Sequence, residues 1–337
     1  MAVGRENGRV AAAPLGALEA RARLYCLDWP RIAERFGFDP EVARQHEATI
    51  SAMQLAAVLE HVAELTGNDA HIIDEMSQLG VGSFSILDYV SACAPTIRAG
   101  LQNWVRFHAV FARGIDIEFR VGAGTGVLEY ASLAPLGTHV QLSYGIAASV
   151  SARLFAWSER LRDAIRVEVD APAPQHACAF LARHGHLFSF GHDRIRIVIP
   201  EAVLDDVPVA AEENLYRIVE TAALAKLADL QREESPLARI TESINQHLKA
   251  GTLSVGSVAG DLNMSERTLQ RLLQDEGTTF RKLTEDTRRS LAERYLKETR
   301  LPIKEITYLL GFSEVSVFSR AAKSWFGLSP KRIRQGG

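Results

Sequence analysis

Two stretches of this chain repeat one helical pattern at a distance of 49 residues. In SERTLQRLLQDEG, which begins at Ser265, four long polar side chains are spaced three and four residues apart, so they share one face of an α-helix. Leucines occupy the other side, where a core would form. The four polar residues are Arg267, Gln270, Arg271 and Gln274. In EVSVFSRAAKSWFG, which begins at Glu314, their equivalents are Ser316, Ser319, Arg320 and Lys323.

A shorter predicted helix and a tight turn precede each polar-faced helix. The first unit, about 253–275, has Ser254 as a helix cap and Asn263 at the turn. The second, about 302–326, has Pro302 near its start and Gly311 at the turn. Asparagine is second only to glycine in tolerating a left-handed backbone, so both turns have suitable residues. The sequence therefore predicts two helix-turn-helix units.

A continuous helical segment, 280–300, joins the two units. Two recognition helices on one chain can enter successive major grooves, about 34 Å apart. Arginine can bind guanine through two hydrogen bonds and glutamine can bind adenine in the same way, each pair giving about 1–3 kcal/mol of discrimination. The serines of the second unit are shorter, so we expect that unit to read sequence less strictly. The cations expected to bind phosphates are Arg320, Lys323, Lys331, Arg332 and Arg334.

Charge is distributed unevenly along the 337 residues. Residues 235–337 hold 17 Lys and Arg against 11 Asp and Glu, a net of +6, which leaves −9 for residues 1–234. An acidic part joined to a basic part indicates that only the second meets a polyanion. We expect a loose leader over 1–20, a first domain over 21–230, a linker over 231–237, and a DNA-binding domain over 238–337.

The first domain mixes helical and strand patterns, which predicts an α+β fold followed by an all-α second domain. Expected helices are 41–65, 69–79, most of 83–113, 137–161, a piece around 174–184, and 212–231; expected strands are 115–121, 127–133, 164–170 and 194–200. The glycines of GAGTG, 122–126, resemble a phosphate-binding loop, but a strand follows them, so we expect a hairpin turn.

No apolar run is long enough to span a membrane, and the three cysteines lie far apart. We therefore expect a cytoplasmic protein that does not contact a membrane. Five His and Cys residues crowd into 176–192, but no spacing among them matches a known metal site. No nucleophile motif is present, so we expect no catalysis, no cofactor and no bound metal.

At this point the C-terminal sequence resembles a known family. LNMSERTLQRLLQDEGTTFRKL, RRSLAERYLKET and LPIKEITYLLGFSEVSVFSRAAKSWFGLSPKRIR are similar to the DNA-binding domain of AraC-type transcriptional regulators over roughly 240–335. The resemblance implies that bases are read by Arg267, Gln270, Arg271, Ser316, Ser319 and Arg320. One departure is Ala322, where the family often has phenylalanine, and Trp325 or Phe326 is expected to compensate.

The N-terminal sequence, with SFSILDYVSACAPTIRAGLQNWVRFHAVF at 83–111 and FSFGHDRIRIVIPEAVLDDVP at 188–208, is similar to the arabinose-binding-like effector domain of one AraC subgroup. The resemblance implies that 21–230 is an effector-sensing and dimerisation domain, with an unidentified small molecule as effector and a homodimer as assembly. It also implies double-stranded promoter DNA as partner, and RNA polymerase as a further partner if the protein is an activator. Arg98, Trp104, Arg106 and His108 are the candidate effector contacts, and the arginines would suit a carboxylate. The alternative is that the aromatics are core and the arginines face solvent.

Two other functions stay open from the residues alone. One is a DNA-targeted enzyme or alkyl-transfer sensor, although the clustered cysteines that would hold its metal are missing. The other is an architectural protein without sequence preference, which the arginine and glutamine stripe disfavours.

Overall fold

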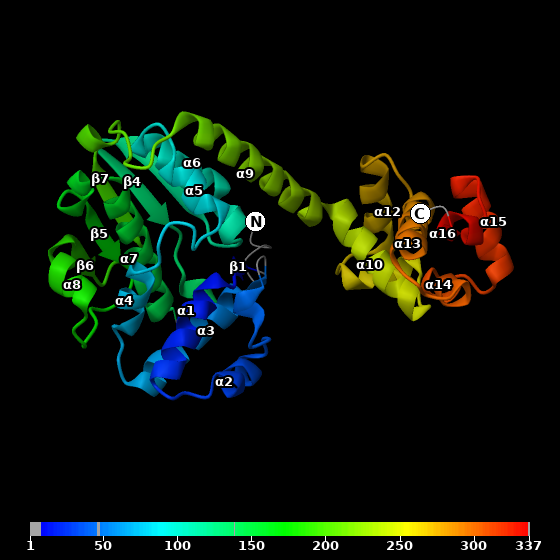
Figure 1. The fold of residues 1–337 in the computed structure, drawn as a ribbon, viewed down its shortest axis with the longest axis horizontal. Coiled ribbons are helices and arrows are strands. Elements are labelled where there is room, and N and C mark those ends of the chain that lie inside the picture. Colours follow the sequence, from blue (N-terminus) through cyan, green and yellow to red (C-terminus); the bar gives the residue numbers. More distant parts are fainter. Residues whose placement is uncertain (1–7, 46–47, 138, 336–337) are drawn as a thin grey trace. The chain divides into compact units, whose positions relative to one another are not determined.

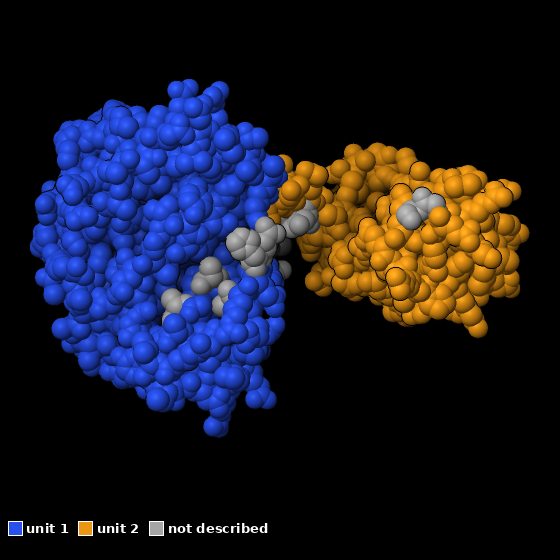
Figure 2. Space-filling view, viewed as in Figure 1, with its two compact units in different colours: residues 1–227 blue, residues 228–337 orange. Residues whose placement is uncertain are grey.

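The computed structural model describes residues 8–45, 48–137 and 139–335. Its chain forms two compact units, 1–227 and 228–337 (Figures 1 and 2). Helix α9, Glu213–Glu234, contributes residues to both units. Each unit has its own apolar core.

The first unit contains a mixed five-stranded sheet. Its strands are β3 Ile117–Gly122, β4 Thr125–Tyr130, β5 Arg166–Val169, β6 Phe188–Phe190 and β7 Arg196–Pro200, in the order β3-β4-β7-β5-β6 (Figure 1). Only β5 and β6 pair in parallel. Between β3 and β4 the chain turns at Ala123 and Gly124, whose φ angles are 52° and 76°. The expected hairpin turn at GAGTG is therefore confirmed.

Helices cover this sheet and form most of the rest of the unit. They are α1 Ala13–Leu24, α2 Trp29–Phe36, α3 Ala52–Thr66, α4 His71–Ser77, α5 Ile86–Ala92, α6 Ile97–Phe111, α7 Val140–Trp157 and α8 Ala179–His184. Short 3-10 turns lie at Val42–Arg44, Ala134–Leu136, Glu159–Arg162, Gly185–Leu187 and Glu201–Val203. Helix α7 contacts α3, α4 and β5, so it lies at the centre of the unit. Its small residues, mostly alanine and serine, allow this close approach on several sides.

Two sequence-based expectations differ from the structure near the N-terminus. Part of the expected leader over 1–20 belongs to the domain, because β1, Arg9–Ala11, pairs with β2, Thr49–Ser51, and α1 buries Leu15 and Leu18 completely. The expected helix over 41–65 begins only at Ala52. Ser51 caps it together with Gln54, and this capping box ends the preceding extended segment.

The second unit is helical throughout its described residues. Beyond the end of α9 its helices are α10 Pro236–Ala250, α11 Val255–Asp261, α12 Glu266–Asp275, α13 Phe280–Glu298, α14 Ile303–Leu309, α15 Val315–Phe326 and α16 Pro330–Gln335. This confirms the expected fold class, a mixed α and β domain followed by an all-α domain with a helix joining two helix-turn-helix units. Within the proposed linker, 231–237, residues 231–234 end α9 and Ser235 caps α10 by accepting a hydrogen bond from the Ala238 amide.

One ion pair is completely buried in the first unit. Arg153 on α7 donates from Nε and Nη2 to the two carboxylate oxygens of Asp88 on α5, at 2.5 and 3.1 Å. The backbone amides of Gly82 and Phe84 also donate to Asp88, at 2.9 and 2.8 Å. The guanidinium lies 3.7 Å from the centre of the Phe84 ring. Each charge therefore has several partners, as burial requires.

We predict that Arg153→Ala lowers the free energy of unfolding of the first unit by about 3–5 kcal/mol, because the Asp88 carboxylate would be left buried without its counter-charge. Arg120→Ala removes an exposed pair with Glu118 on β3 and should cost less than about 1 kcal/mol. Urea unfolding of the two variants measures both effects. Equal losses would show that the buried pair has no special importance for stability.

Candidate DNA-reading surface and effector pocket

The first polar stripe lies on α12. Ser265 caps this helix by accepting a hydrogen bond from the Thr268 amide at 3.1 Å. Leu269 and Leu273 are buried in the core of the second unit. The predicted polar residues Arg267, Gln270, Arg271 and Gln274 are all exposed. Among the described residues, none forms an ion pair with either arginine, so these guanidinium groups are available to a ligand.

The second polar stripe lies on α15 and is chemically weaker. Ser316 is exposed and donates a hydrogen bond to the Glu314 carboxylate at 2.9 Å, whereas Ser319 is half-buried. Arg320 and Lys323 are exposed. In the part of the chain that the structure describes, neither cation has an ion-pair partner. The serines of the α15 stripe are therefore less available to a ligand than the long polar side chains of the α12 stripe.

Both helix-turn-helix turns use a left-handed residue. Asn263 has a φ of 52° and Gly311 a φ of 70°. Ser254 caps α11 as predicted, by accepting a hydrogen bond from the Ser257 amide. The second turn has an additional support, because Arg288 on α13 donates to the carbonyls of Leu310 and Gly311, at 2.9 and 3.3 Å.

The small residue Ala322 lies on the inner face of α15 and is fully buried. Aromatic rings surround the neighbouring core: Phe312 lies 5.8 Å from Phe318 and 6.2 Å from Trp325, measured between ring centres. Trp325 also donates from its indole nitrogen to Glu285 at 3.2 Å. Trp325 therefore belongs to the aromatic cluster that packs against this core.

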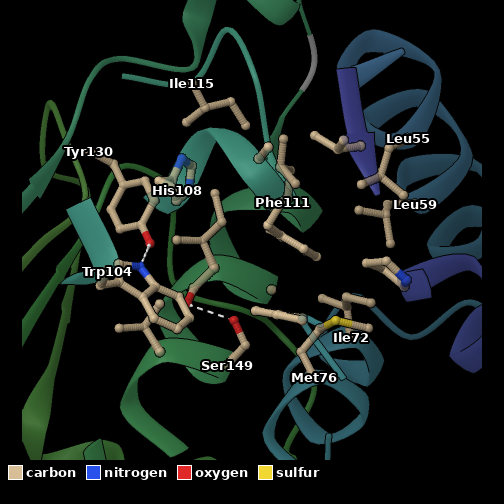
Figure 3. A pocket seen from close by; sticks show the side chains of 18 residues that line it. Leu55, Leu59, Ile72, Met76, Trp104, His108, Phe111, Ile115, Tyr130 and Ser149 are labelled. Atoms are coloured by element: carbon tan, nitrogen blue, oxygen red, sulfur yellow. Dashed lines mark hydrogen bonds between the residues drawn. The ribbon is translucent and has the colours of Figure 1, made fainter. Parts of the chain in front are cut away.

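The first unit contains an apolar cavity of about 60 Å³ (Figure 3). Side chains of α3, α4, α6 and α7 form most of its wall, with contributions from β1, β4 and the start of α1. The wall includes Leu55, Leu59, Ile72, Met76, Phe84, Trp104, His108, Phe111, Ile115, Tyr130, Leu142, Gly145, Ile146, Ser149 and Val150.

Four polar side chains interrupt this wall: Trp104, His108, Tyr130 and Ser149. The Trp104 indole donates to the Tyr130 hydroxyl at 3.0 Å, and the His108 ring lies edge-on to Tyr130 at 5.8 Å between centres. Ser149 donates its hydroxyl to the Ile146 carbonyl at 3.1 Å. Burial lowers the pKa of His108 to about 4 and raises the pKa of the Tyr130 phenol. At neutral pH His108 and Tyr130 are therefore both uncharged.

The structure separates the four candidate effector contacts into two pairs. Trp104 and His108 line the cavity. Arg98 instead pairs with Asp205 at 2.8 Å and Arg106 with Glu220 at 3.4 Å, and neither belongs to the cavity wall. Tyr130 also lines the cavity and was not among the predicted contacts, although alternation along β4 places it on the same side as buried Leu128.

The histidine-rich segment does not come together as a metal centre. His176 pairs with Asp69 at 2.8 Å, His184 packs against the rings of Phe155 and Phe180, and His192 contacts the Ser189 hydroxyl. Over the described residues, no group of three or more His, Cys, Asp or Glu side chains is arranged to hold a metal. Within the same residues, no helix is both long enough and apolar enough to cross a membrane.

Two family models match the sequence. One, described as the arabinose-binding domain of AraC transcription regulator, N-terminal, matches residues 27–207, more than half of the chain. The other, described as a helix-turn-helix domain, matches residues 258–336. The two matches fall on the unit that holds the cavity and the unit that holds the polar stripes, respectively.

Individual relatives are transcriptional regulators. The ornithine utilization regulator of Pseudomonas aeruginosa is 27% identical over 299 residues, which cover 88% of this chain and 87% of that protein. The transcriptional activator NphR of Rhodococcus sp is 38% identical over 108 residues, 32% of each chain. The crystal structure of the transcriptional regulator CdpR from Pseudomonas aeruginosa covers 95% of this chain and 97% of that one, with 19% identity and a TM-score of 0.41.

We predict that Gly311→Ala destabilises the second unit by about 1–3 kcal/mol, because a side chain is strained at positive φ and its Cβ would lie 2.9 Å from Leu248 Cδ2. Asn263→Gly is the matched control, since asparagine already occupies the left-handed region there and the change should stay within about 1 kcal/mol. Labelling with 5-fluorotryptophan gives Trp325 its own NMR signal during urea unfolding. Equal losses of stability in the two variants would show that the left-handed turn geometry is not the reason for a glycine at position 311.

Proposed function

We infer how this protein acts from one premise, namely that the chain belongs to the AraC family of transcriptional regulators. Its N-terminal unit is an effector-binding domain, and its C-terminal unit is a helix-turn-helix DNA-binding domain. We propose that α12 and α15 are the recognition helices and that they enter adjacent segments of the major groove of a promoter. The exposed polar stripe on each helix, with no ion-pair partner for its cations among the described residues, is the observation that carries this proposal.

The two helices are proposed to contribute differently. Arg267, Gln270 and Arg271 on α12 have the length and donor pattern for direct contacts with base edges, and Gln274 extends the same face. On α15, Ser316 and Ser319 are short, and Ser316 already donates to Glu314. We therefore assign sequence reading mainly to α12, while Arg320 and Lys323 supply phosphate contacts.

A route for effector control is visible within the first unit. Helix α6 presents Trp104 and His108 to the cavity, and it also contacts α9. That contact consists of a hydrogen bond from Asn103 to the Tyr216 hydroxyl, at 3.2 Å, and the ion pair between Arg106 and Glu220. Helix α9 leads the chain out of this unit and into the DNA-binding domain. A ligand that moves α6 would therefore also move α9. A ligand can shift the equilibrium between two arrangements of the protein only if it binds one of them more tightly than the other.

The proposal includes a homodimer, cytoplasmic location and, for an activator, contact with RNA polymerase. Exposed apolar side chains on α9 support pairing of two copies: Leu215, Ile218, Ala222 and Ala225 follow one another at spacings of three and four residues. Sedimentation velocity at micromolar concentration tests the dimer, and Ile218→Lys should shift the protein towards monomer. A protein that sediments as a monomer before this change would contradict the dimer.

The DNA-reading proposal predicts a bound motif with two blocks about one helical turn apart. Selection of genomic fragments by the purified protein at about 0.15 M salt measures it. Arg271→Ala should weaken binding by about 5- to 150-fold and remove definition from one block, because each bidentate base contact contributes about 1–3 kcal/mol.

The control for this experiment is Lys249→Ala, which removes an exposed cation from α10, outside both helix-turn-helix units. It should leave both blocks intact. Binding without any motif would favour an architectural protein, and an unchanged motif in Arg271→Ala would remove α12 from the recognition role.

A further inference from the structure

We propose that the effector is an uncharged, mainly apolar molecule about the size of a single ring, and that it binds in the cavity between α6 and α7. This inference rests on the proposed function, because it takes effector control of DNA binding as given. It replaces the carboxylate ligand that the arginines near α6 suggested from the sequence.

The electrostatics of the cavity favours an uncharged ligand. Among the residues that the structure describes, eighteen line the cavity, and none of these is Asp, Glu, Lys or Arg. His108 is the one histidine among these eighteen residues, and its pKa of about 4 leaves it neutral at physiological pH. A buried carboxylate or ammonium would meet no opposite charge, which is strongly unfavourable.

The cations close to this region are already committed. Arg153 passes behind the wall residue Phe84, but both carboxylate oxygens of Asp88 accept from it, and it donates further to the Ser149 carbonyl at 3.1 Å. Arg98 and Arg106 have carboxylate partners on the outside of the unit. Recruiting Arg153 to an anionic ligand would leave the buried Asp88 carboxylate with too little positive charge.

The Tyr130 hydroxyl can donate a hydrogen bond to a ligand. The Tyr130 hydroxyl accepts from the Trp104 indole, and among the described residues nothing accepts its own hydrogen. Since burial raises the pKa of this phenol, the proton stays in place and can be donated. A hydroxyl or carbonyl oxygen on an otherwise apolar ligand would satisfy that donor.

The volume of the cavity limits the size of its ligand. A volume of about 60 Å³ is well below the roughly 150 Å³ of an engineered cavity that binds benzene. The cavity must therefore widen around even a small ring, and Met76 is the adaptable part of the wall because its side chain has three rotatable bonds. A glycine at position 145, inside α7, leaves room there: a Cβ at that position would lie 3.3 Å from Met76 Cγ.

Gly145 also provides a test that does not threaten the fold. Glycine inside a helix is about 1 kcal/mol less favourable than alanine, so Gly145→Ala should keep or raise stability while it narrows the cavity. Gly260→Ala on α11 is the matched control, because the same change there meets nothing within 4 Å. Any difference in ligand binding between the two variants is then due to the cavity.

The experiment uses the full chain labelled with 5-fluorotryptophan, with the Trp104 signal identified from Trp104→Phe. Benzyl alcohol, cyclohexanol and indole are the neutral probes, and benzoate carries a carboxylate on the same ring as benzyl alcohol. We expect neutral probes at millimolar concentration to shift Trp104 at pH 7, benzoate to leave it unchanged, and Gly145→Ala to weaken binding about fivefold or more. Gly260→Ala should bind as the parent does.

Two results would overturn the inference: benzoate binding as tightly as benzyl alcohol, or no shift of Trp104 with any neutral probe. Because the signal is read without DNA, this outcome is separate from failure of the DNA-reading proposal. If the two-block motif is recovered while Trp104 does not respond, the regulator stands and only the ligand class falls. If Trp104 responds while no motif is recovered, the ligand class stands and DNA reading falls.

Discussion

The buried pair between Asp88 and Arg153 is the interaction on which the architecture of the first unit depends. It joins α5 to the central helix α7 and fixes the loop before α5, because the carboxylate also accepts from two backbone amides of that loop. Ser85, at the end of this loop, has a φ of 58°, an unfavourable angle for a non-glycine residue. The loop brings Phe84 to the cavity. The shape of an apolar pocket is thus determined by two charges behind its wall, each satisfied by several partners.

The second unit was predictable because its determinants are local. Helix caps, left-handed turn residues and the spacing of leucines act within a few residues of one another, and Ser254, Asn263 and Gly311 take the expected roles. The stripes of α12 and α15 are exposed, but which of their residues contact bases is still a prediction. Support for the second turn from Arg288 was not foreseen, because that residue lies 22 positions before the carbonyl it binds.

The first unit was harder to predict because its determinants are distant in sequence. Asp88 and Arg153 are 65 positions apart, and the strand at 9–11 exists only through pairing with 49–51. Alternation predicted four strands of the sheet, whereas the three-residue strand β6 is too short to show a period. The arginines of α6 were proposed as ligand contacts because they lie on the same helical stretch as Trp104 and because arginine suits a carboxylate. Their carboxylate partners, Asp205 and Glu220, lie more than 100 positions away and could not be assigned from the pattern.

The absence of charge from the cavity's described wall has a thermodynamic consequence. A ligand that gains most of its affinity from leaving water binds with a negative change in heat capacity, so its binding enthalpy varies with temperature. The affinity of this site then follows a curve with a maximum instead of rising steadily on cooling. A sensor built this way registers the temperature of the cell together with the concentration of its ligand.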